Sequence, residues 1–393
     1  MKMIKPISQD LLYAMFLWLG ILMISNLASN SIAYQVESKP ASGNSTSPID
    51  SPFQISEQQD GLTIEFDGRL FARYVVTAAN KPYLWPIIGP TGKPMTRAFP
   101  MEQVDAEPES YRDHPHHRGL MYGHESCGLA GWRFPKSAQD WEQIMGKERT
   151  RIGGDSWHEP ATYASRLKTP NKARGGKRRT EMLATIKHRE FKELKVRADR
   201  AVVLQICDHL NSAGKRFMTE HRRLVFRAAD SSRSIDFDQT FLASDGDVVF
   251  EDRKDAGLGI RVPLTMAAES KQGGAAVNSD GLPLDEAWGK PAKWCDYHGP
   301  VGSEHLGIAF LNHPTSYRFP TRWHVRNYGL FASNPFGLKS FDRKLNDGTT
   351  TLKRGEKLEL RHRLIFHKGD ASAASIEEAW KTYAKENVSH EQE

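Results

Sequence analysis

Several classes of protein are excluded by what the sequence has little of. Three cysteines occur in 393 residues, and none of them stands in CxxC spacing. At most one disulfide could form, so a disulfide scaffold is excluded. No Gly-x-Gly-x-x-Gly follows a strand pattern and no Walker A motif occurs, which argues against the common nucleotide-binding folds. The basic run at residues 168–179 stands without a zinc finger or an RNA-binding motif, so we expect a solvated loop there and no nucleic-acid partner.

Long apolar runs are equally scarce, and the main one lies near the N-terminus. Residues 11–25, LLYAMFLWLGILMIS, follow two lysines and are short for a spanning helix. The small residues of SIA at 31–33 suit signal peptidase, so we expect a signal peptide or an N-terminal anchor at 1–33. Residues 34–57, rich in Ser and Pro, are expected to form a flexible lead-in. The body would then be exported, periplasmic or extracellular, and would contact a membrane only through an uncleaved N-terminal segment.

Alternation of apolar and polar residues dominates the rest of the chain. In residues 62–76, LTIEFDGRLFARYVV, two alternating runs meet at Asp67-Gly68, a strong hairpin signal. Period two with a polar opposite face is typical of antiparallel sheets that pack one face on a core. We therefore predict an all-β protein, a large antiparallel β-sandwich with long loops, over residues 58–370. A short C-terminal helix and a tail are expected at 371–393.

The most unusual stretch is YRDHPHHRGLMYGHES at residues 111–126, which holds four of the fifteen histidines. Imidazoles serve as acids or bases near neutral pH. We predict that His117 and His124 are catalytic, with Glu125 or Asp252 as the carboxylate partner. A structural, hydrogen-bonded loop is the alternative interpretation.

Neutral imidazoles also suit metal ions. The candidate metal ligands are His116, His117 and His124, although their spacing matches no specific zinc motif. No cofactor is predicted, and a divalent metal stays open as an alternative.

Aromatic rings and arginines gather in later stretches, at residues 285–299 and 312–337. Rings cover the apolar C–H face of a sugar, and guanidinium groups bind its hydroxyls or carboxylates. The alternative is a packed loop with the arginines at its surface. The predicted substrate-binding residues are His116, Arg118, Lys254, Trp288, Trp294, Tyr297, Trp323, His324 and Arg326.

Four stretches carry a resemblance to a known family: DHPHHRG, DEAWGKPAKWCDYHGP, HPTSYRFPTRWHVRNYGLFASNPFG and RHRLIFHKGD. They resemble a bacterial family of unknown function that carries a methane-oxygenase (PmoA) label, over roughly residues 62–370. After His124 the family usually continues with glycine, aspartate and an aromatic residue, whereas this chain reads ESCGLAGW, so Glu125 is expected to replace the aspartate. The matching positions are His114, His116, His117, Arg118, His124, Asp252, Lys254, Asn278, Trp288, Trp294, Asp296, Tyr297, His313, Thr321, Trp323, His324, Arg326, Asn334 and His367.

The methane-oxygenase label conflicts with the sequence, because the membrane copper enzyme needs several spanning helices and this chain has one apolar run. By analogy, the predicted sandwich is similar to mutarotase-like and polysaccharide-lyase-like supersandwiches. That analogy implies an exported carbohydrate-processing enzyme of isomerase, lyase or hydrolase type, acting on a carbohydrate or another small molecule. The alternatives are a non-catalytic module that binds glycans or a cell-surface partner, and a metalloenzyme with histidine ligands.

The two polar segments are expected to converge in space. Trp323 and Tyr328 would expose large apolar faces if their segment stood alone in solvent. We therefore predict that His117 or His124 faces the same pocket as His324 or Arg326, within about one ligand's width.

Overall fold

The computed structural model describes residues 51–146, 152–168 and 170–386. The predicted signal or anchor at 1–33 and most of the predicted lead-in lie outside these ranges, so export stays a prediction. Within these ranges no helix combines the length and the apolar character needed to cross a bilayer. The first strand begins at Phe53, so regular structure starts inside the segment 34–57 that was expected to be flexible.

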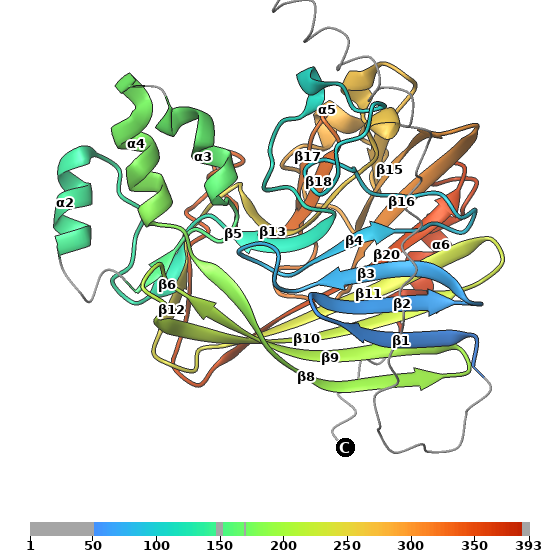
Figure 1. The fold of residues 1–393 in the computed structure, drawn as a ribbon, viewed down its shortest axis with the longest axis horizontal. Coiled ribbons are helices and arrows are strands. Elements are labelled where there is room, and N and C mark those ends of the chain that lie inside the picture. The colour runs from blue at the N-terminus through green and yellow to red at the C-terminus, as the bar shows by residue number, and fades with distance from the viewer. Residues whose placement is uncertain (1–50, 147–151, 169, 387–393) are drawn as a thin grey trace, which may run out of the picture. The chain divides into compact units, whose positions relative to one another are not determined.

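Two eight-stranded sheets form the sandwich (Figure 1), and all strand ladders among the described residues are antiparallel. The predicted all-β sandwich is confirmed. The first sheet has the order β1 (Phe53–Gln58), β2 (Gly61–Phe66), β3 (Arg69–Val75), β4 (Tyr83–Ile87), β5 (Leu120–His124), β13 (Ala256–Arg261), β18 (Leu330–Asn334) and β17 (Arg322–Val325). The second has the order β14 (Ala275–Asn278), β15 (Trp294–Val301), β16 (Glu304–Asn312), β20 (Lys357–Lys368), β11 (Ser232–Leu242), β10 (Arg216–Ala228), β9 (Arg200–Leu210) and β8 (Thr185–Arg197). A smaller sheet joins β19 (Thr350–Leu352), β12 (Val248–Phe250), β6 (Cys127–Leu129) and β7 (Gly153–Gly154).

The predicted hairpin at Asp67-Gly68 is confirmed. Phe66 pairs with Arg69 across the turn. Asp67 and Gly68 both have positive φ, 50° and 65°, as a two-residue turn between twisted strands requires.

The helices are short, and one of them corrects the sequence interpretation. They are α2 (Ala138–Gly146), α3 (Pro160–Leu167), α4 (Pro170–Glu181), α5 (Leu284–Ala287) and α6 (Ile376–Tyr383). The basic run at 168–179, expected to be a solvated loop, lies mostly in α4. Pro170 at the first helical position and two arginines in the last turn both favour a helix there. The predicted C-terminal helix is confirmed as α6.

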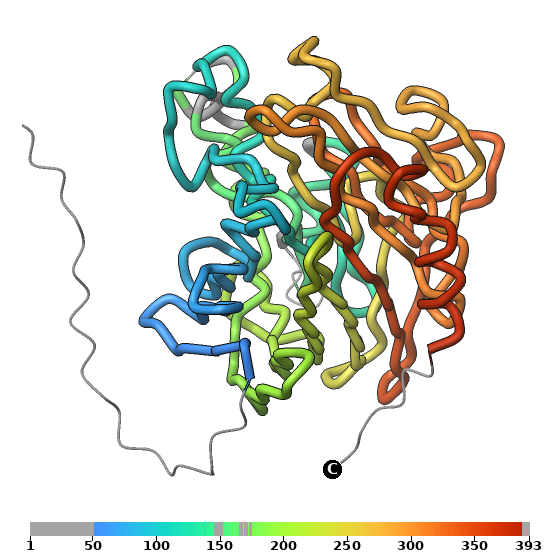
Figure 2. Tube along the Cα trace, turned by 90° about the vertical axis from the view of Figure 1, so that its right-hand side faces the viewer, coloured from blue at the N-terminus to red at the C-terminus, as the bar shows by residue number. Residues whose placement is uncertain are grey.

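The helices lie at different places on the sandwich. Helices α2, α3 and α4 lie together at the upper left of Figure 1, above β6 and β12. In Figure 2 the blue strands β1–β4 lie at the left of the sandwich, and the red segment that carries α6 lies at the right. Helix α6 packs on the outer face of the second sheet, where Ile376 and Tyr383 are buried with Trp294 and Leu311.

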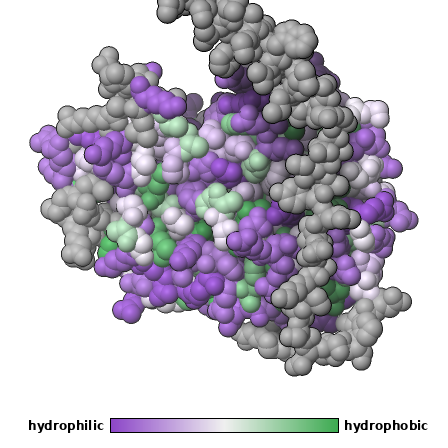
Figure 3. Space-filling view, in the orientation of Figure 1, coloured by the Kyte–Doolittle hydropathy of each residue, from purple (hydrophilic) through white to green (hydrophobic). Residues whose placement is uncertain are grey.

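The main core lies between the two sheets and follows the alternation of the strands. On β11, Ile235, Phe237 and Phe241 are buried in it, while the residues between them face outward or make polar contacts. All three cysteines are buried and unbridged, and burial raises the pKa of Cys127, which keeps it a neutral thiol. The face drawn in Figure 3 is mainly hydrophilic, with apolar residues in scattered patches.

A buried ionic network also crosses the space between the sheets. Arg222 on β10 donates to both carboxylate oxygens of Glu220, at 2.6 and 3.0 Å, and to the Tyr74 hydroxyl of β3 at 3.0 Å. His209 and Gln239 also hydrogen-bond to Glu220, at 2.8 and 2.7 Å. Both charges of this ion pair are therefore fully buried and fully partnered, and removing one leaves the other uncompensated.

We predict that Arg222→Met lowers the free energy of unfolding by about 3–5 kcal/mol, because the Glu220 carboxylate loses its buried partner. The double variant Arg222→Met, Glu220→Met should recover most of this loss. The control is Arg73→Ala, which removes an ion pair with Asp60 that is 38% exposed on both sides and should cost at most about 1 kcal/mol. Urea denaturation measures all three. An Arg222→Met protein as stable as the Arg73→Ala control would contradict the argument.

Candidate functional site

A polar cluster lies on the outer face of the first sheet, away from the main core. One row of residues, Met121, Gly259, Ala332 and His324, crosses β5, β13, β18 and β17 in register. Because neighbouring residues in a strand face opposite sides, His324 lies on the outer face and Trp323 on the core face. The row forms the floor of the candidate site.

The floor is covered by the segment that follows β7. Trp157 packs on Met121 and Ala332. Gly123 leaves room for it, because a Cβ on Gly123 would lie 2.8 Å from the Trp157 Cα and 2.9 Å from the Ser156 carbonyl oxygen. This glycine thus allows the segment to lie directly on the sheet.

Asp155 fixes the conformation of the covering segment. Its Oδ1 accepts the backbone N–H groups of Trp157 and His158, both at 3.0 Å, and its Oδ2 lies 2.8 Å from His158 Nδ1. Burial alone would lower the pKa of His158, but the charge and hydrogen bond of Asp155 outweigh burial and raise it. His158 is therefore an oriented imidazole that binds a proton more readily than a free one.

The histidine-rich stretch forms the next wall. His114 stacks on the Tyr328 ring at 4.5 Å and on the His117 ring at 5.1 Å. Arg261 lies 3.2 Å from His117 Nδ1 and donates to Asp113 Oδ1 at 2.6 Å. A guanidinium group can only donate, so His117 Nδ1 accepts and the ring proton is on Nε2.

Two buried imidazole nitrogens of the cluster have no hydrogen-bond partner among the described residues: His117 Nε2 and His324 Nδ1. Both residues are 2% exposed. Burial, with nearby cations, lowers the pKa of His117 well below its usual range, and burial lowers that of His324 to about 4, so both rings are neutral at pH 7. Buried polar atoms are nearly always paired, so these two nitrogens are expected to bind a ligand or an ordered water.

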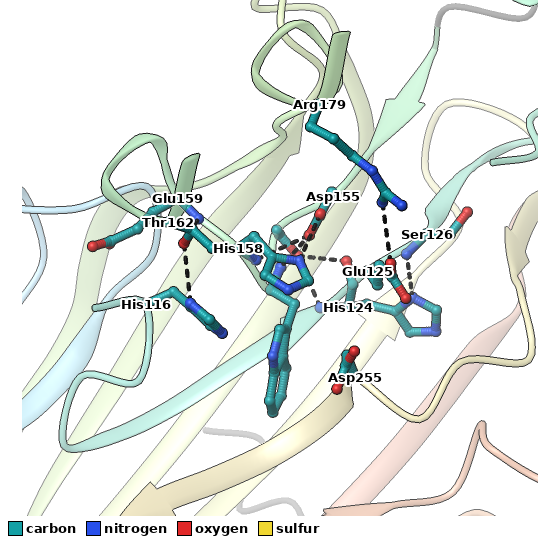
Figure 4. Close-up of polar contacts among 12 residues, drawn as sticks. His116, His124, Glu125, Ser126, Asp155, His158, Glu159, Thr162, Arg179 and Asp255 are labelled. Carbon is teal, nitrogen blue, oxygen red and sulfur yellow. Dashed lines mark hydrogen bonds and ion pairs between the residues drawn. The ribbon is translucent and has the colours of Figure 1, made fainter. Parts of the chain in front are cut away.

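Three carboxyl groups complete the cluster: Glu125, Asp155 and Asp255 (Figure 4). Burial and the charges of Asp155 and Asp255 raise the pKa of Glu125, even though Arg179 donates to it at 3.3 Å. Burial acts in the same direction on Asp255, but His324 and Lys254 outweigh it and lower its pKa. Two nearby carboxyl groups thus have pKa values displaced in opposite directions.

The predicted proximity of the two polar segments is confirmed, and a shared pocket stays a prediction. The Tyr328 ring lies 6.0 Å from the His117 ring, and the Arg326 guanidinium lies 5.6 Å from the same tyrosine ring. His324 also contributes to the electrostatic environment of His117. The structure therefore places His117 beside the 324–328 segment, as predicted.

Of the predicted residues, seven lie in or next to the cluster. Arg118 donates two 2.9 Å hydrogen bonds to buried Glu159, and Lys254 contacts Asp255 at 2.8 Å. The seven are His116, His117, Arg118, Glu125, Lys254, His324 and Arg326.

His124 and Trp323 lie elsewhere, on the core face of the first sheet. His124 accepts the Ser126 N–H at 3.0 Å and packs edge-on against Phe250 and Phe336. Trp323 is 0% exposed and donates to the Ala292 carbonyl at 3.0 Å, so it has no free face for a sugar. The three candidate metal ligands therefore do not converge, because His124 faces the opposite side of the sheet from His116 and His117. Among the described residues, no three His, Cys, Asp or Glu side chains are placed to hold one metal ion.

The remaining predicted residues have structural contacts outside the cluster. Asp252 accepts four backbone N–H groups of the 338–348 loop at 2.7–3.1 Å. Tyr297 accepts the Ala268 N–H at 3.0 Å and lies 3.2 Å from two carbonyls of the 326–327 turn. Trp288 packs on Phe341, and Trp294 donates to Glu377 at 2.8 Å.

Sequence reasoning missed Asp155, His158 and Arg261. The first two lie in GGDSWHEP at residues 153–160, where an aspartate precedes a histidine by three positions between Gly-Gly and a proline. With that spacing one carboxylate can hydrogen-bond to both the backbone and the imidazole. This was the sequence pattern that could have identified the pair.

We predict that Asp155→Asn lowers the pKa of His158, because the main interactions that raise it come from the Asp155 carboxylate. Asparagine keeps an acceptor oxygen for the two backbone N–H groups, so the segment should stay folded. The histidine titration can be followed by NMR. Asp113→Asn is the matched control, since Asp113 contacts Arg261 and His114 instead, and should leave His158 unchanged. Equal titration of His158 in the wild type and in Asp155→Asn would refute the assignment.

Burial also makes the fold sensitive to acid through His124. Its pKa falls from 6.5 to about 3 in the folded protein, chiefly through desolvation. The depressed folded-state pKa means that the stabilisation is complete above pH 6.5 and is lost as pH falls towards 3. We predict that His124→Gln reduces the slope of unfolding free energy against pH between 6 and 4 by about 1.4 kcal/mol per pH unit, the effect of one proton. Denaturation series at several pH values measure the slope, and an unchanged slope would contradict the prediction.

Comparison with solved structures finds only distant similarities. A galactose mutarotase-like protein from Clostridium acetobutylicum is 12% identical, with a TM-score of 0.34, and the match covers 81% of this chain and 99% of that one. A galactose 1-epimerase from Lactobacillus acidophilus is 9% identical, with a TM-score of 0.35 and coverage of 82% and 100%. An α-galactosidase from Lactobacillus brevis is 9% identical, with a TM-score of 0.36, over 82% of this chain and 40% of that one. These similarities are low and carry no inference about activity.

Comparison of the sequence with protein families identifies the family of the chain. A search of curated protein sequences found no match. The model of a family of unknown function, DUF6807, matches residues 61–381, which include the second sheet, the first sheet except β1, and the candidate site. The chain therefore belongs to the DUF6807 family.

Proposed function

We propose that the protein is a carbohydrate-processing enzyme that acts by proton transfer at the cluster on the outer face of the first sheet. The observation that carries the proposal is the pairing of Glu125, whose pKa is raised, with Asp255, whose pKa is lowered. Neighbouring carboxyl groups displaced in this way are suited to act as acid and base on one substrate.

Each group has a defined role in this proposal. Asp255 acts as the base that accepts a proton from the substrate, and Glu125 acts as the acid that donates one. His117 Nε2–H donates a hydrogen bond to a substrate oxygen, because it has no partner among the described residues. His158, held by Asp155, contributes a second protonatable group.

The substrate class follows from the mixture of groups. Carboxylates accept hydrogen bonds, guanidinium groups donate them, and each hydroxyl of a sugar can do both. Arg179 donates to Glu125 and Lys254 donates to Asp255, so each of these two cations already has a carboxyl partner. A neutral or mildly acidic sugar fits such a site, and the reaction would be of isomerase, lyase or hydrolase type.

The proposal is tested by turnover of neutral and acidic glycosides, with product detection by NMR. We expect Glu125→Gln and Asp255→Asn each to lower kcat by about 10²–10⁴-fold, the usual contribution of one proton-transfer group. Activity should fall at low pH as Asp255 becomes protonated and at high pH as Glu125 ionises, and Glu125→Gln should remove the alkaline limb.

Asp60→Asn serves as the matched control, because it makes the same carboxyl-to-amide change at an exposed ion pair on another part of the sheet. It should keep wild-type activity. Saturable glycan binding without turnover would favour a non-catalytic binding module instead. Turnover that Glu125→Gln and Asp255→Asn leave intact would rule out this acid–base pair.

A further inference from the structure

Arg326 differs from the other cations around the candidate site. Its guanidinium lies 5.6 Å from the Tyr328 ring and makes no hydrogen bond or ion pair with any residue that the structure describes. Four other cations of this region each pair with a carboxyl group. These pairs are Arg118 with Glu159, Arg179 with Glu125, Lys254 with Asp255 and Arg261 with Asp113.

The backbone holds Arg326 in a defined position. It follows β17 directly and lies two residues after His324, which directs it to the outer face of the first sheet. Its N–H donates to the Leu330 carbonyl at 2.8 Å, and its carbonyl accepts the Gly329 N–H at 3.0 Å. The Tyr297 hydroxyl, from the second sheet, lies 3.2 Å from the same carbonyl. The unpaired guanidinium is therefore carried by an anchored turn.

Tyr328 adds a second unpaired polar group. Its hydroxyl has no hydrogen-bond partner among residues 51–146, 152–168 and 170–386, and the ring is held between His114, at 4.5 Å, and Arg261, at 4.8 Å. Burial raises the pKa of Tyr328 to about 12 against the opposing charges of Arg261 and Arg326, so the hydroxyl keeps its proton at pH 7. Arg326 and Tyr328 are only partly buried, and the polar atoms of both side chains stay open to solvent. A ligand can therefore reach both donors.

Two buried arginines lie against the same tyrosine. Arg97 and Arg261 are 1% and 2% exposed. Arg97 donates to the Tyr328 carbonyl at 3.2 Å, and its backbone N–H donates to the Arg261 carbonyl at 3.0 Å. Burial, and then the charge of Arg261, lower the pKa of Arg97 to about 10. With Arg326, three guanidinium groups meet at one tyrosine, and each attracts an anion bound there.

This group of donors is near the proposed base. Arg326 contributes to the electrostatic environment of His324, and His324 Nδ1 lies 3.7 Å from Asp255 Oδ1. Arg326 and Asp255 both contribute to the electrostatic environment of the Tyr328 hydroxyl. A ligand held by Arg326 and Tyr328 is therefore placed near Asp255.

The surrounding carboxyl groups define the kind of anion. Asp113 accepts from Arg261 at 2.6 Å, and Glu107 accepts two backbone N–H groups at 3.0 and 2.9 Å, so neither serves Arg326. A carboxylate offers two oxygens in one plane, which matches the fork of a guanidinium. A phosphate dianion would bring a larger negative charge towards Asp255 and is repelled more strongly.

We propose that Arg326 and the Tyr328 hydroxyl bind a carboxylate of the substrate, so that the site selects an acidic sugar, such as a uronate, over its neutral counterpart. This inference rests on the proposed function, because it takes Glu125 and Asp255 as the reacting groups. It adds the residues that determine specificity.

The test is calorimetric titration of the full chain with matched pairs of sugars: methyl glucuronoside with methyl glucoside, and methyl galacturonoside with methyl galactoside. Glucose 6-phosphate is the dianionic probe. We expect one uronoside to bind about tenfold or more tightly than its neutral partner, and Arg326→Gln to remove this difference, the loss of a hydrogen bond between charged groups. Arg326→Lys should restore part of it, since the charge returns without the fork. Tyr328→Phe should weaken uronoside binding by about fivefold.

The matched control is Arg73→Gln, which makes the same change at the exposed ion pair with Asp60 on β3 and should bind every probe as the wild type does. Thermal unfolding of each variant shows that the fold is kept. Equal affinity for the two members of both pairs, tighter binding of glucose 6-phosphate, no binding of any probe, or an equal loss of acidic and neutral sugars in Arg326→Gln would overturn the proposal.

Turnover measured on the same variants separates this proposal from the proposed function. Selective uronoside binding through Arg326 without turnover would support the carboxylate site and count against the enzyme. Turnover of a neutral glycoside that Glu125→Gln abolishes and Arg326→Gln leaves unchanged would support the enzyme and overturn the carboxylate site.

Discussion

The two-residue period of the strands decides where every polar group of this protein can act. Residues that alternate along β17 and β5 are divided between the inter-sheet core and the outer face, so His324 reaches the candidate site while Trp323 and His124 are enclosed. On β15 the same period turns Tyr297 inward and sends Trp294, Asp296 and His298 outward. The candidate site is consequently on an outer face, and the inter-sheet core is left to the Glu220–Arg222 network and apolar packing.

Close approach to the sheets depends on glycine at a few positions. Gly123 lets the Trp157 segment lie on the first sheet, and Gly307 lets His367 cross a strand of the second. A side chain at either position would meet backbone or ring atoms. Glycine thus permits close packing on the outer faces of both sheets. An aspartate–histidine pair lies on each of these faces: Asp155 with His158, and Asp296 with His298.

Electrostatics then separate groups that are chemically alike. Glu125 and Asp255 are both largely buried, yet the former faces other carboxylates and the latter faces His324 and Lys254, so their pKa values are displaced in opposite directions. His117 and His158 differ in the same way, because Arg261 contacts the first ring and Asp155 the second. The proposed chemistry of the cluster depends on these neighbours more than on residue type.

The sequence by itself determined the all-β sandwich, the Asp67-Gly68 hairpin and the C-terminal helix, because alternation and turn chemistry are local properties of the chain. It also located the histidine-rich stretch and predicted its contact with the 324–328 segment, because large aromatic faces are unfavourable in solvent. It could not separate Asp252, which binds a loop backbone, from Asp255, three residues later, which faces His324. The sequence did not indicate a role for Asp155 and His158, because these residues reach the candidate site only when their segment packs across β5 and β13. Which face each side chain takes and which charge it meets were decided only by tertiary packing, because strand register and long-range contacts set both.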